Sequence, residues 1–231
     1  MLLNSGNIKD LAPTFVENYT DENVSKAVYQ NYHNRIKEYK KIMGIGSKYF
    51  HGHLHDSRII SCKNNKGDLY LKLNEMATLQ FACALIDKMK LKINISKMIF
   101  PLEIISENTN HLSLNTVDVS GKLDEIKFVA LNEYLYEEII EWTDGKIKIA
   151  FDLWANRIRH NYNRYLLLLS CENVIINERQ RIYWNKYFGD KYDKYYNVFL
   201  EERNKGECLA DYSLCEKLID KLWKTNIIKE I

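Results

Sequence analysis

The sequence predicts an α+β fold in which an antiparallel β-sheet is flanked by an N-terminal helix and by C-terminal helices. Apolar residues recur at helical spacing over residues 21–43, alternate with polar residues between about 56 and 176, and return to helical spacing over about 177–227. Strands that follow one another without helices between them favour antiparallel pairing. We expect a single domain over residues 1–231, because no repeat or low-complexity linker divides the chain.

The N-terminal helix is expected over residues 21–43, where the start and stop signals agree. Thr20 can cap the first turn, acidic residues follow it, and Lys40 and Lys41 lie in the last turn. Gly44 stands just beyond, at the position where a left-handed residue commonly ends a helix. Because its apolar residues share one face, this helix should pack on the sheet.

A first β-hairpin is expected where the hydrophobic period changes after residue 56. Residues 58–62 and 69–73 have the composition and alternation of strands, and Gly67 lies in the polar turn between them. The next segment, residues 76–86, is ambiguous, because its composition also suits a helix. Its alternating apolar residues favour a strand.

A second hairpin is indicated by residues 138–142 and 147–151, which flank an Asp-Gly turn. Asp-Gly readily adopts the positive φ angles that a tight turn requires. Ile147, Ile149 and Phe151 should therefore face the core, while Lys146 and Lys148 face water.

Other segments complete the predicted secondary structure. Further strands are expected at Leu91–Ser96, Ile99–Ser106, His111–Leu114, Ile126–Leu131 and 165–176. From Asn177 onward, three successive sets of apolar residues at helical spacing, separated near Gly189 and Gly206, predict two or three helices.

Charge and cysteine usage limit the classes of function. Lys and Arg number 33 against 31 Asp and Glu, and they are not concentrated in one part of the chain, so nucleic-acid binding is not indicated. No apolar run is long enough for a membrane span, and the N-terminus does not resemble a signal peptide. An odd number of singly spaced cysteines is typical of a reducing compartment, so we expect a cytoplasmic protein. These cysteines are Cys62, Cys83, Cys171, Cys208 and Cys215.

A histidine-rich segment is the candidate metal site. Imidazoles at alternate positions of an extended chain project to the same side and could converge on a transition-metal ion. The segment is superficially similar to the H-x-H-x-D-H box of metallo-β-lactamase-like hydrolases, with the last two residues exchanged. In the alternative interpretation it is a loop in which the aspartate binds the backbone ahead of the first strand. The candidate ligands are His51, His53, His55 and Asp56.

Motifs of nucleophilic catalysis, phosphate binding and dinucleotide binding are not found in the sequence. The nearest approach to a glycine-rich loop is Gly44-Ile45-Gly46, which lacks a third glycine and a preceding strand. No catalytic residue and no cofactor are therefore assigned.

Residues 183–199 contain more aromatic side chains than one helix face can bury. Tyr and Trp are favoured at protein interfaces, and interspersed lysines would supply a polar rim. The alternative is that these rings pack the C-terminal helices against the sheet. The candidate partner-binding residues are Tyr183, Trp184, Tyr187, Tyr192, Tyr195 and Tyr196.

Residues 54–60, LHDSRII, resemble the LHDS or LHDG element that opens the sheet in an uncharacterised family of bacterial proteins. The run from Leu131 through the second hairpin is similar to the second half of that pattern. The resemblance spans residues 20–175, and the chain departs from the pattern over residues 74–110 and in its helical C-terminus. The resemblance implies an N-terminal helix paired with an antiparallel sheet.

The resemblance also implies a function, since proteins of this kind recur as immunity proteins in bacterial toxin systems. It implies that His55 and Asp56 serve the shape of the family rather than catalysis. We therefore expect a non-catalytic cytoplasmic protein-binding module, an immunity protein whose partner is a toxin. The alternative function is a metal-dependent hydrolase that uses the histidine-rich segment.

Overall fold

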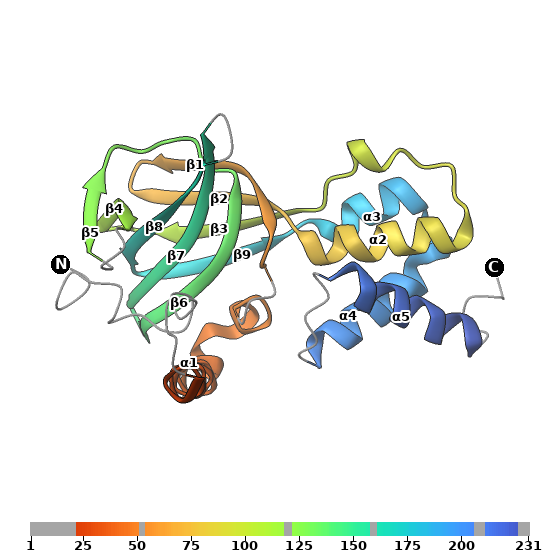
Figure 1. Ribbon diagram of the computed structural model, residues 1–231, viewed down its shortest axis with the longest axis horizontal. Coiled ribbons are helices and arrows are strands. Elements are labelled where there is room, and N and C mark those ends of the chain that lie inside the picture. The colour runs from red at the N-terminus through yellow and green to blue at the C-terminus, as the bar shows by residue number, and fades with distance from the viewer. Residues whose placement is uncertain (1–21, 51–53, 118–121, 158–160, 206–210, 226–231) are drawn as a thin grey trace.

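The computed structural model describes residues 22–50, 54–117, 122–157, 161–205 and 211–225. Within these residues the expected α+β architecture with an antiparallel sheet is confirmed. Figure 1 shows two lobes, which we call the β lobe and the helical lobe. The β lobe is a curved sheet with α1 against it, and the helical lobe contains α2 to α5 beyond one end of that sheet.

The elements follow one another along the chain with these bounds. The helices are α1 (Glu22–Met43), α2 (Met76–Met89), α3 (Gln180–Phe188), α4 (Asp193–Asn204) and α5 (Tyr212–Lys224), with short 3-10 helices η3 (Gly44–Lys48), η4 (Ile95–Lys97) and η5 (Asp190–Tyr192). The strands are β1 (Ser57–Asn65), β2 (Asp68–Asn74), β3 (Pro101–Glu107), β4 (His111–Val117), β5 (Leu123–Ile126), β6 (Glu133–Thr143), β7 (Lys146–Arg157), β8 (Asn161–Cys171) and β9 (Asn173–Glu178).

The strands of the described residues form one sheet in the order β5-β4-β8-β7-β6-β1-β2-β3-β9, and all neighbours are antiparallel. β1 pairs with β6 only through Ser57 and Arg58, so the sheet has two halves with a narrow join. Leu71 and Ile104 from one half share a buried cluster with Ile149 from the other. The sheet therefore curves around a common core.

Both predicted hairpins are confirmed. In the first, Asn65 pairs with Asp68, and Lys66 and Gly67 make the turn with positive φ angles. In the second, Thr143 pairs with Lys146 across the Asp-Gly turn, where Gly145 has a φ of 71°. Asp-Gly and Gly-containing turns form here because glycine adopts positive φ without a Cβ clash.

The strand predicted for residues 76–86 is wrong, because this segment is the major part of α2. Phe81 and Leu85 are buried one helical turn apart, whereas Leu79 and Cys83 are only partly buried. Packing of α2 against α5 buries a helical face, which the alternating apolar residues did not reveal.

Three other strand predictions need correction. Leu91–Ser96 forms no strand and leads into η4, and β5 ends at Ile126, so the strand expected over Ile126–Leu131 is wrong. The single strand expected over 165–176 is two strands, β8 and β9, interrupted at Glu172. The break at Glu172 separates β8, which pairs with β4 and β7, from β9, which pairs with β3, and local alternation does not specify such partners.

Most of the described buried apolar residues fall into two clusters. One fills the β lobe and includes Ile36 and Met43 of α1, as the helix pattern predicted. The other fills the helical lobe and includes Phe81 of α2 with Trp184 and Phe199 of the C-terminal helices. The C-terminal helices thus flank the sheet and bury their apolar faces against α2 rather than over the sheet. No described helix has the length and apolar character needed to cross a membrane.

Candidate functional site

Four of the six candidate partner-binding aromatics hold the helical lobe together. Trp184, Tyr192, Tyr195 and Tyr196 are buried, which removes their rings from any partner and corrects the sequence-based assignment. The Trp184 ring lies 4.2 Å from the ring of Phe188, measured between centroids, and its indole N–H donates to the backbone oxygen of Tyr192. The rings could be buried because α2, predicted as a strand, supplies another helical face.

The other two candidates, Tyr183 and Tyr187, are partly exposed and lie on one side of α3 with centroids 6.4 Å apart. The Tyr187 hydroxyl donates to the backbone oxygen of Lys97 at 3.3 Å and accepts from the backbone N–H of Ile99 at 3.1 Å. These two hydrogen bonds connect the backbone at Lys97 and Ile99 to α3.

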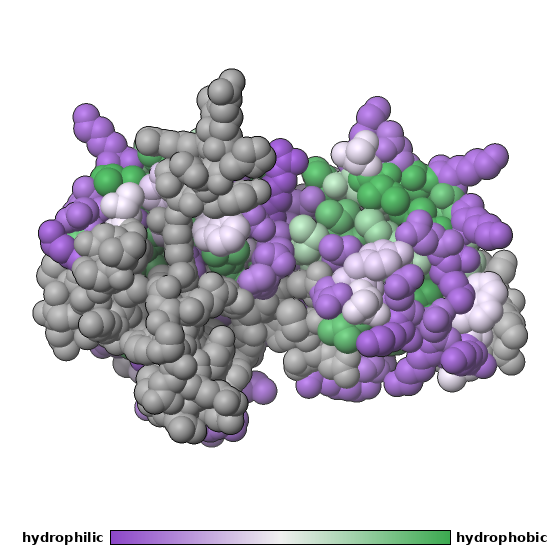
Figure 2. Space-filling view, viewed as in Figure 1, coloured by the Kyte–Doolittle hydropathy of each residue, from purple (hydrophilic) through white to green (hydrophobic). Residues whose placement is uncertain are grey.

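Ile95 and Ile99, within this segment, each keep 38% of their surface exposed. Together with Tyr183 and Tyr187 they define what we call the η4–α3 surface. Lys97 lies between the two isoleucines in sequence and is exposed. Figure 2 shows apolar side chains gathered over the upper part of the helical lobe, with polar residues around them. An apolar centre with a polar rim is the usual composition of a protein interface.

The junction between the two lobes contains a buried ionic network that the sequence did not reveal. Arg203 of α4 donates from Nη1 to Oε1 of Glu75 at 2.8 Å, and its guanidinium lies over the ring of Tyr49 at 5.0 Å. Thr78 and Gln180 donate to the other carboxylate oxygen of Glu75. Both oxygens of Glu75 are thus engaged, which indicates a structural role.

Electrostatics at this junction agree with that role. Burial raises the pKa of Tyr49 well above its ordinary value, although the Arg203 charge acts in the opposite direction. Burial is the largest single effect and alone would lower the pKa of Arg203, but the Glu75 carboxylate together with Tyr49 and Tyr196 outweighs it and raises the pKa. Arg203 and Tyr49 therefore keep their ordinary protonation states, cationic and neutral, at neutral pH.

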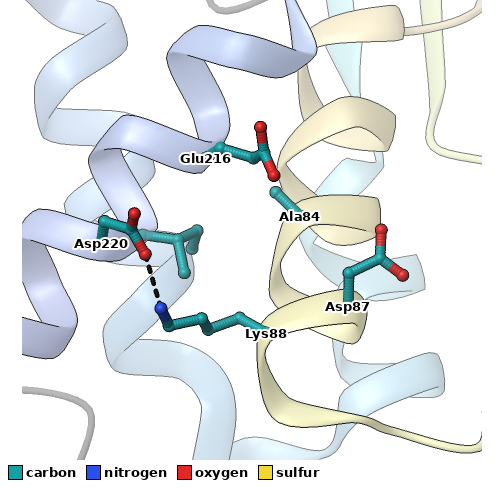
Figure 3. Close-up of a pocket in the computed structure, with 6 residues that line it drawn as sticks. Ala84, Asp87, Lys88, Glu216 and Asp220 are labelled. Carbon is teal, nitrogen blue, oxygen red and sulfur yellow. Dashed lines mark hydrogen bonds and ion pairs between the residues drawn. The ribbon is translucent and has the colours of Figure 1, made fainter.

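A pocket of about 300 Å³ lies between α2 and α5 (Figure 3). Lys88 reaches across it to the Asp220 carboxylate at 2.6 Å, and this hydrogen bond lowers the pKa of Asp220. Asp87 accepts a hydrogen bond from the Tyr212 hydroxyl at 2.6 Å. These contacts connect α2 to α5, and the remaining carboxylate of the pocket belongs to Glu216. The charged side chains of the pocket are exposed to solvent.

Of the candidate metal ligands, His51 and His53 lie outside the described residues. His55 Nδ1 lies 2.8 Å from Asp56 Oδ2 at the start of β1. Nearby Glu133 has a raised pKa, mainly through burial and then through the Asp56 carboxylate. Within the described part of the chain, no three His, Cys, Asp or Glu side chains are grouped as metal ligands would be. The metal hypothesis stays a prediction that depends on His51 and His53.

Of the cysteines in the described residues, Cys62, Cys83 and Cys171 are free thiols, and Cys215 is buried. Cys208 lies outside the described residues.

No family model, no curated protein and no solved structure matches this chain.

Proposed function

We propose that this protein is a non-catalytic protein-binding module and that the η4–α3 surface is its contact site. The observation that carries the proposal is the exposure of Ile95 and Ile99 beside the Tyr183–Tyr187 pair on a backbone fixed by hydrogen bonds. Apolar groups on a rigid scaffold lose little conformational freedom on binding, so more of their burial energy appears as affinity.

The partner that we propose is a toxin, which would make this chain a bacterial immunity protein acting in the cytoplasm. The resemblance of residues 54–60 to a bacterial family supports this role. Singly spaced cysteines support a reducing compartment. The near balance of acidic and basic residues argues for a protein partner rather than nucleic acid.

Affinity capture from the cells that express this chain tests the proposal. We expect wild-type protein to retain one dominant protein, and Ile95→Ser/Ile99→Ser to reduce its recovery at least about tenfold, because truncating an interface centre commonly costs more than 1 kcal/mol per residue. Growth arrest by the recovered protein, relieved when this chain is co-expressed, would support the immunity role.

The matched control is Ile60→Ser/Phe128→Ser, which removes two exposed apolar side chains from the β lobe. This variant should recover as much partner as wild type, and circular dichroism should show that both variants are folded. Equal recovery by all three proteins would exclude the η4–α3 surface, and recovery of no partner would overturn the binding function.

A second candidate, metal-dependent hydrolysis, is favoured by the His55–Asp56 contact and by Glu133 beside it. This function requires that tag-free protein retain a stoichiometric transition metal and lose it in the His53→Ala/His55→Ala variant. Elemental analysis without a bound metal would exclude it.

A further inference from the structure

The chain from the end of α2 to β3 alternates lysines with apolar residues. Residues 88–99 read KMKLKINISKMI, with four lysines and no acidic residue. The apolar members are divided by the fold, because Met98 is buried and Leu91 and Ile93 partly pack against the helical core. Ile95 and Ile99 remain exposed and contribute to the η4–α3 surface.

The lysines of this segment differ in their partners. Lys88 pairs with Asp220 at 2.6 Å, whereas Lys90, Lys92 and Lys97 are exposed and make no ion pair within the described part of the chain. On α3, the Lys186 ammonium lies 5.6 Å from the centroid of the Tyr183 ring. The segment that contains the exposed isoleucines therefore carries three lysines that no described carboxylate pairs with.

Three carboxylates of the helical lobe lie together in a pocket. Asp87, Glu216 and Asp220 line the pocket between α2 and α5 (Figure 3). In Figure 1 the connection from α2 to β3 runs above α2, and α5 lies below it. Lys92 and Lys97, on the connection, thus lie on another side of α2 than these three carboxylates, which favours an acidic partner at the η4–α3 surface.

The basic segment is also held in one shape. The Asn94 side chain accepts from the backbone N–H of Ser96 at 3.1 Å, and the N–H of Met98 donates to the backbone oxygen of Ile95 at 3.0 Å. Tyr187 then fixes the backbone on both sides of Met98. A rigid, shallow surface suits another folded surface better than a bilayer, into which apolar side chains must protrude.

We infer that the η4–α3 surface binds an acidic protein face, in which an apolar centre covers Ile95 and Ile99 and surrounding carboxylates meet Lys92 and Lys97. This inference rests on the proposed binding function and adds the chemistry of the partner. Opposite charges at the rim speed association and exclude basic partners, while the apolar centre supplies affinity.

A random peptide library displayed on phage tests this chemistry with a defined probe. We expect full-length wild-type protein to enrich peptides that combine Asp or Glu with large apolar residues. Synthetic versions of the enriched peptides should bind about tenfold more weakly at high salt than at low salt, because salt screens rim charges. At low salt, the Lys92→Glu/Lys97→Glu variant should bind these peptides more weakly than wild type does.

The matched control is Lys63→Glu/Lys127→Glu, which makes the same change in net charge at exposed lysines of the β lobe. The inference would be supported by acidic peptides that bind this control as tightly as wild type and bind Lys92→Glu/Lys97→Glu more weakly. Peptides without acidic residues that depend on Ile95 and Ile99 alone would overturn the inference and leave the binding function intact.

Two further outcomes separate the remaining alternatives. Peptides that bind both Lys92→Glu/Lys97→Glu and Ile95→Ser/Ile99→Ser as tightly as they bind wild type would exclude both the inference and the site. Binding to phosphatidylserine vesicles, abolished by Lys92→Glu/Lys97→Glu in the absence of peptide binding, would assign the surface to a membrane and overturn the acidic-protein inference.

Discussion

Arg203 and Glu75, 128 residues apart in the sequence, form a buried ion pair at 2.8 Å where the helical lobe meets the β lobe. Arg203 lies near the end of α4, and Glu75 lies between β2 and α2. Their side chains are 2% and 0% exposed. This pair therefore connects α4 to the residue that links β2, in the β lobe, with α2, in the helical lobe.

Removing one member of this pair should be costly. Arg203→Met leaves Glu75 buried without its cation, and we expect a loss of about 3–5 kcal/mol in the free energy of unfolding. Glu75→Gln/Arg203→Met should recover part of that loss, because no charge then stays buried. Urea denaturation of the full-length variants measures both effects.

The control for this prediction is Arg181→Met, which breaks the more exposed Arg181–Asp193 pair at 3.3 Å. It should cost less than about 1 kcal/mol. If Arg203→Met were no more destabilising than Arg181→Met, the buried pair would not contribute as its environment indicates.

The two apolar clusters should unfold as one unit, as a single domain over the whole chain requires. Phe151 in the β lobe and Phe81 in the helical lobe are fully buried, and each change to Ala should cost about 3–5 kcal/mol. Hydrogen exchange followed by mass spectrometry should show that either variant lowers protection of the slowest amides in both lobes. Loss of protection confined to the mutated lobe would indicate two independent domains.

Stability should fall at alkaline pH. Burial raises the pKa of Cys62 from 9.0 to about 11 and that of Tyr195 from 10.0 to about 12. Below about pH 9 both states of the protein keep these protons, so stability is fully present. As the pH rises from about 9 to 12 the unfolded chain loses protons first, and the free energy of unfolding declines.

Urea denaturation at several pH values measures this decline, with the Cys62→Ala variant as a comparison. The variant lacks the Cys62 thiol, so its free energy of unfolding should fall less steeply than that of wild type between about pH 9 and 11. If the free energy of unfolding of both proteins fell equally with pH, the pKa of Cys62 would be the same in the folded and unfolded states, which would contradict the prediction.

The end of α2 offers a stabilising substitution. Lys90 has φ 52° and ψ 41°, and the following N–H, of Leu91, donates to the backbone oxygen of Ile86 at 3.0 Å. Glycine tolerates this left-handed conformation better than lysine, so Lys90→Gly should raise the free energy of unfolding by up to about 1 kcal/mol. Thermal denaturation measures the change. Lys92→Gly, at a position without positive φ, should give no gain, and equal gains would contradict this explanation.

The sequence alone determined the elements whose signals are local. The helix expected over residues 21–43 is Glu22–Met43, and the second hairpin forms around its Asp-Gly turn. Ile147, Ile149 and Phe151 are buried as alternation predicted, and Lys146 is exposed, while Lys148 is only partly exposed and pairs with Glu141. Caps, tight turns and side-chain alternation depend on neighbours within a few residues, so they can be recognised without the fold.

Only the tertiary structure decided which surfaces meet. Residues 76–86 became a helix because α5 and the C-terminal aromatics bury one of its faces, and that same packing removed Trp184 and Tyr196 from the candidate binding surface. Of the six candidate aromatics, Tyr183 and Tyr187 remain partly exposed, both on α3. The position of Ile99 beside Tyr187, and of Arg203 beside Glu75, arises from contacts between residues far apart in the chain. Local patterns carry no information on such contacts, because they depend on how whole elements pack.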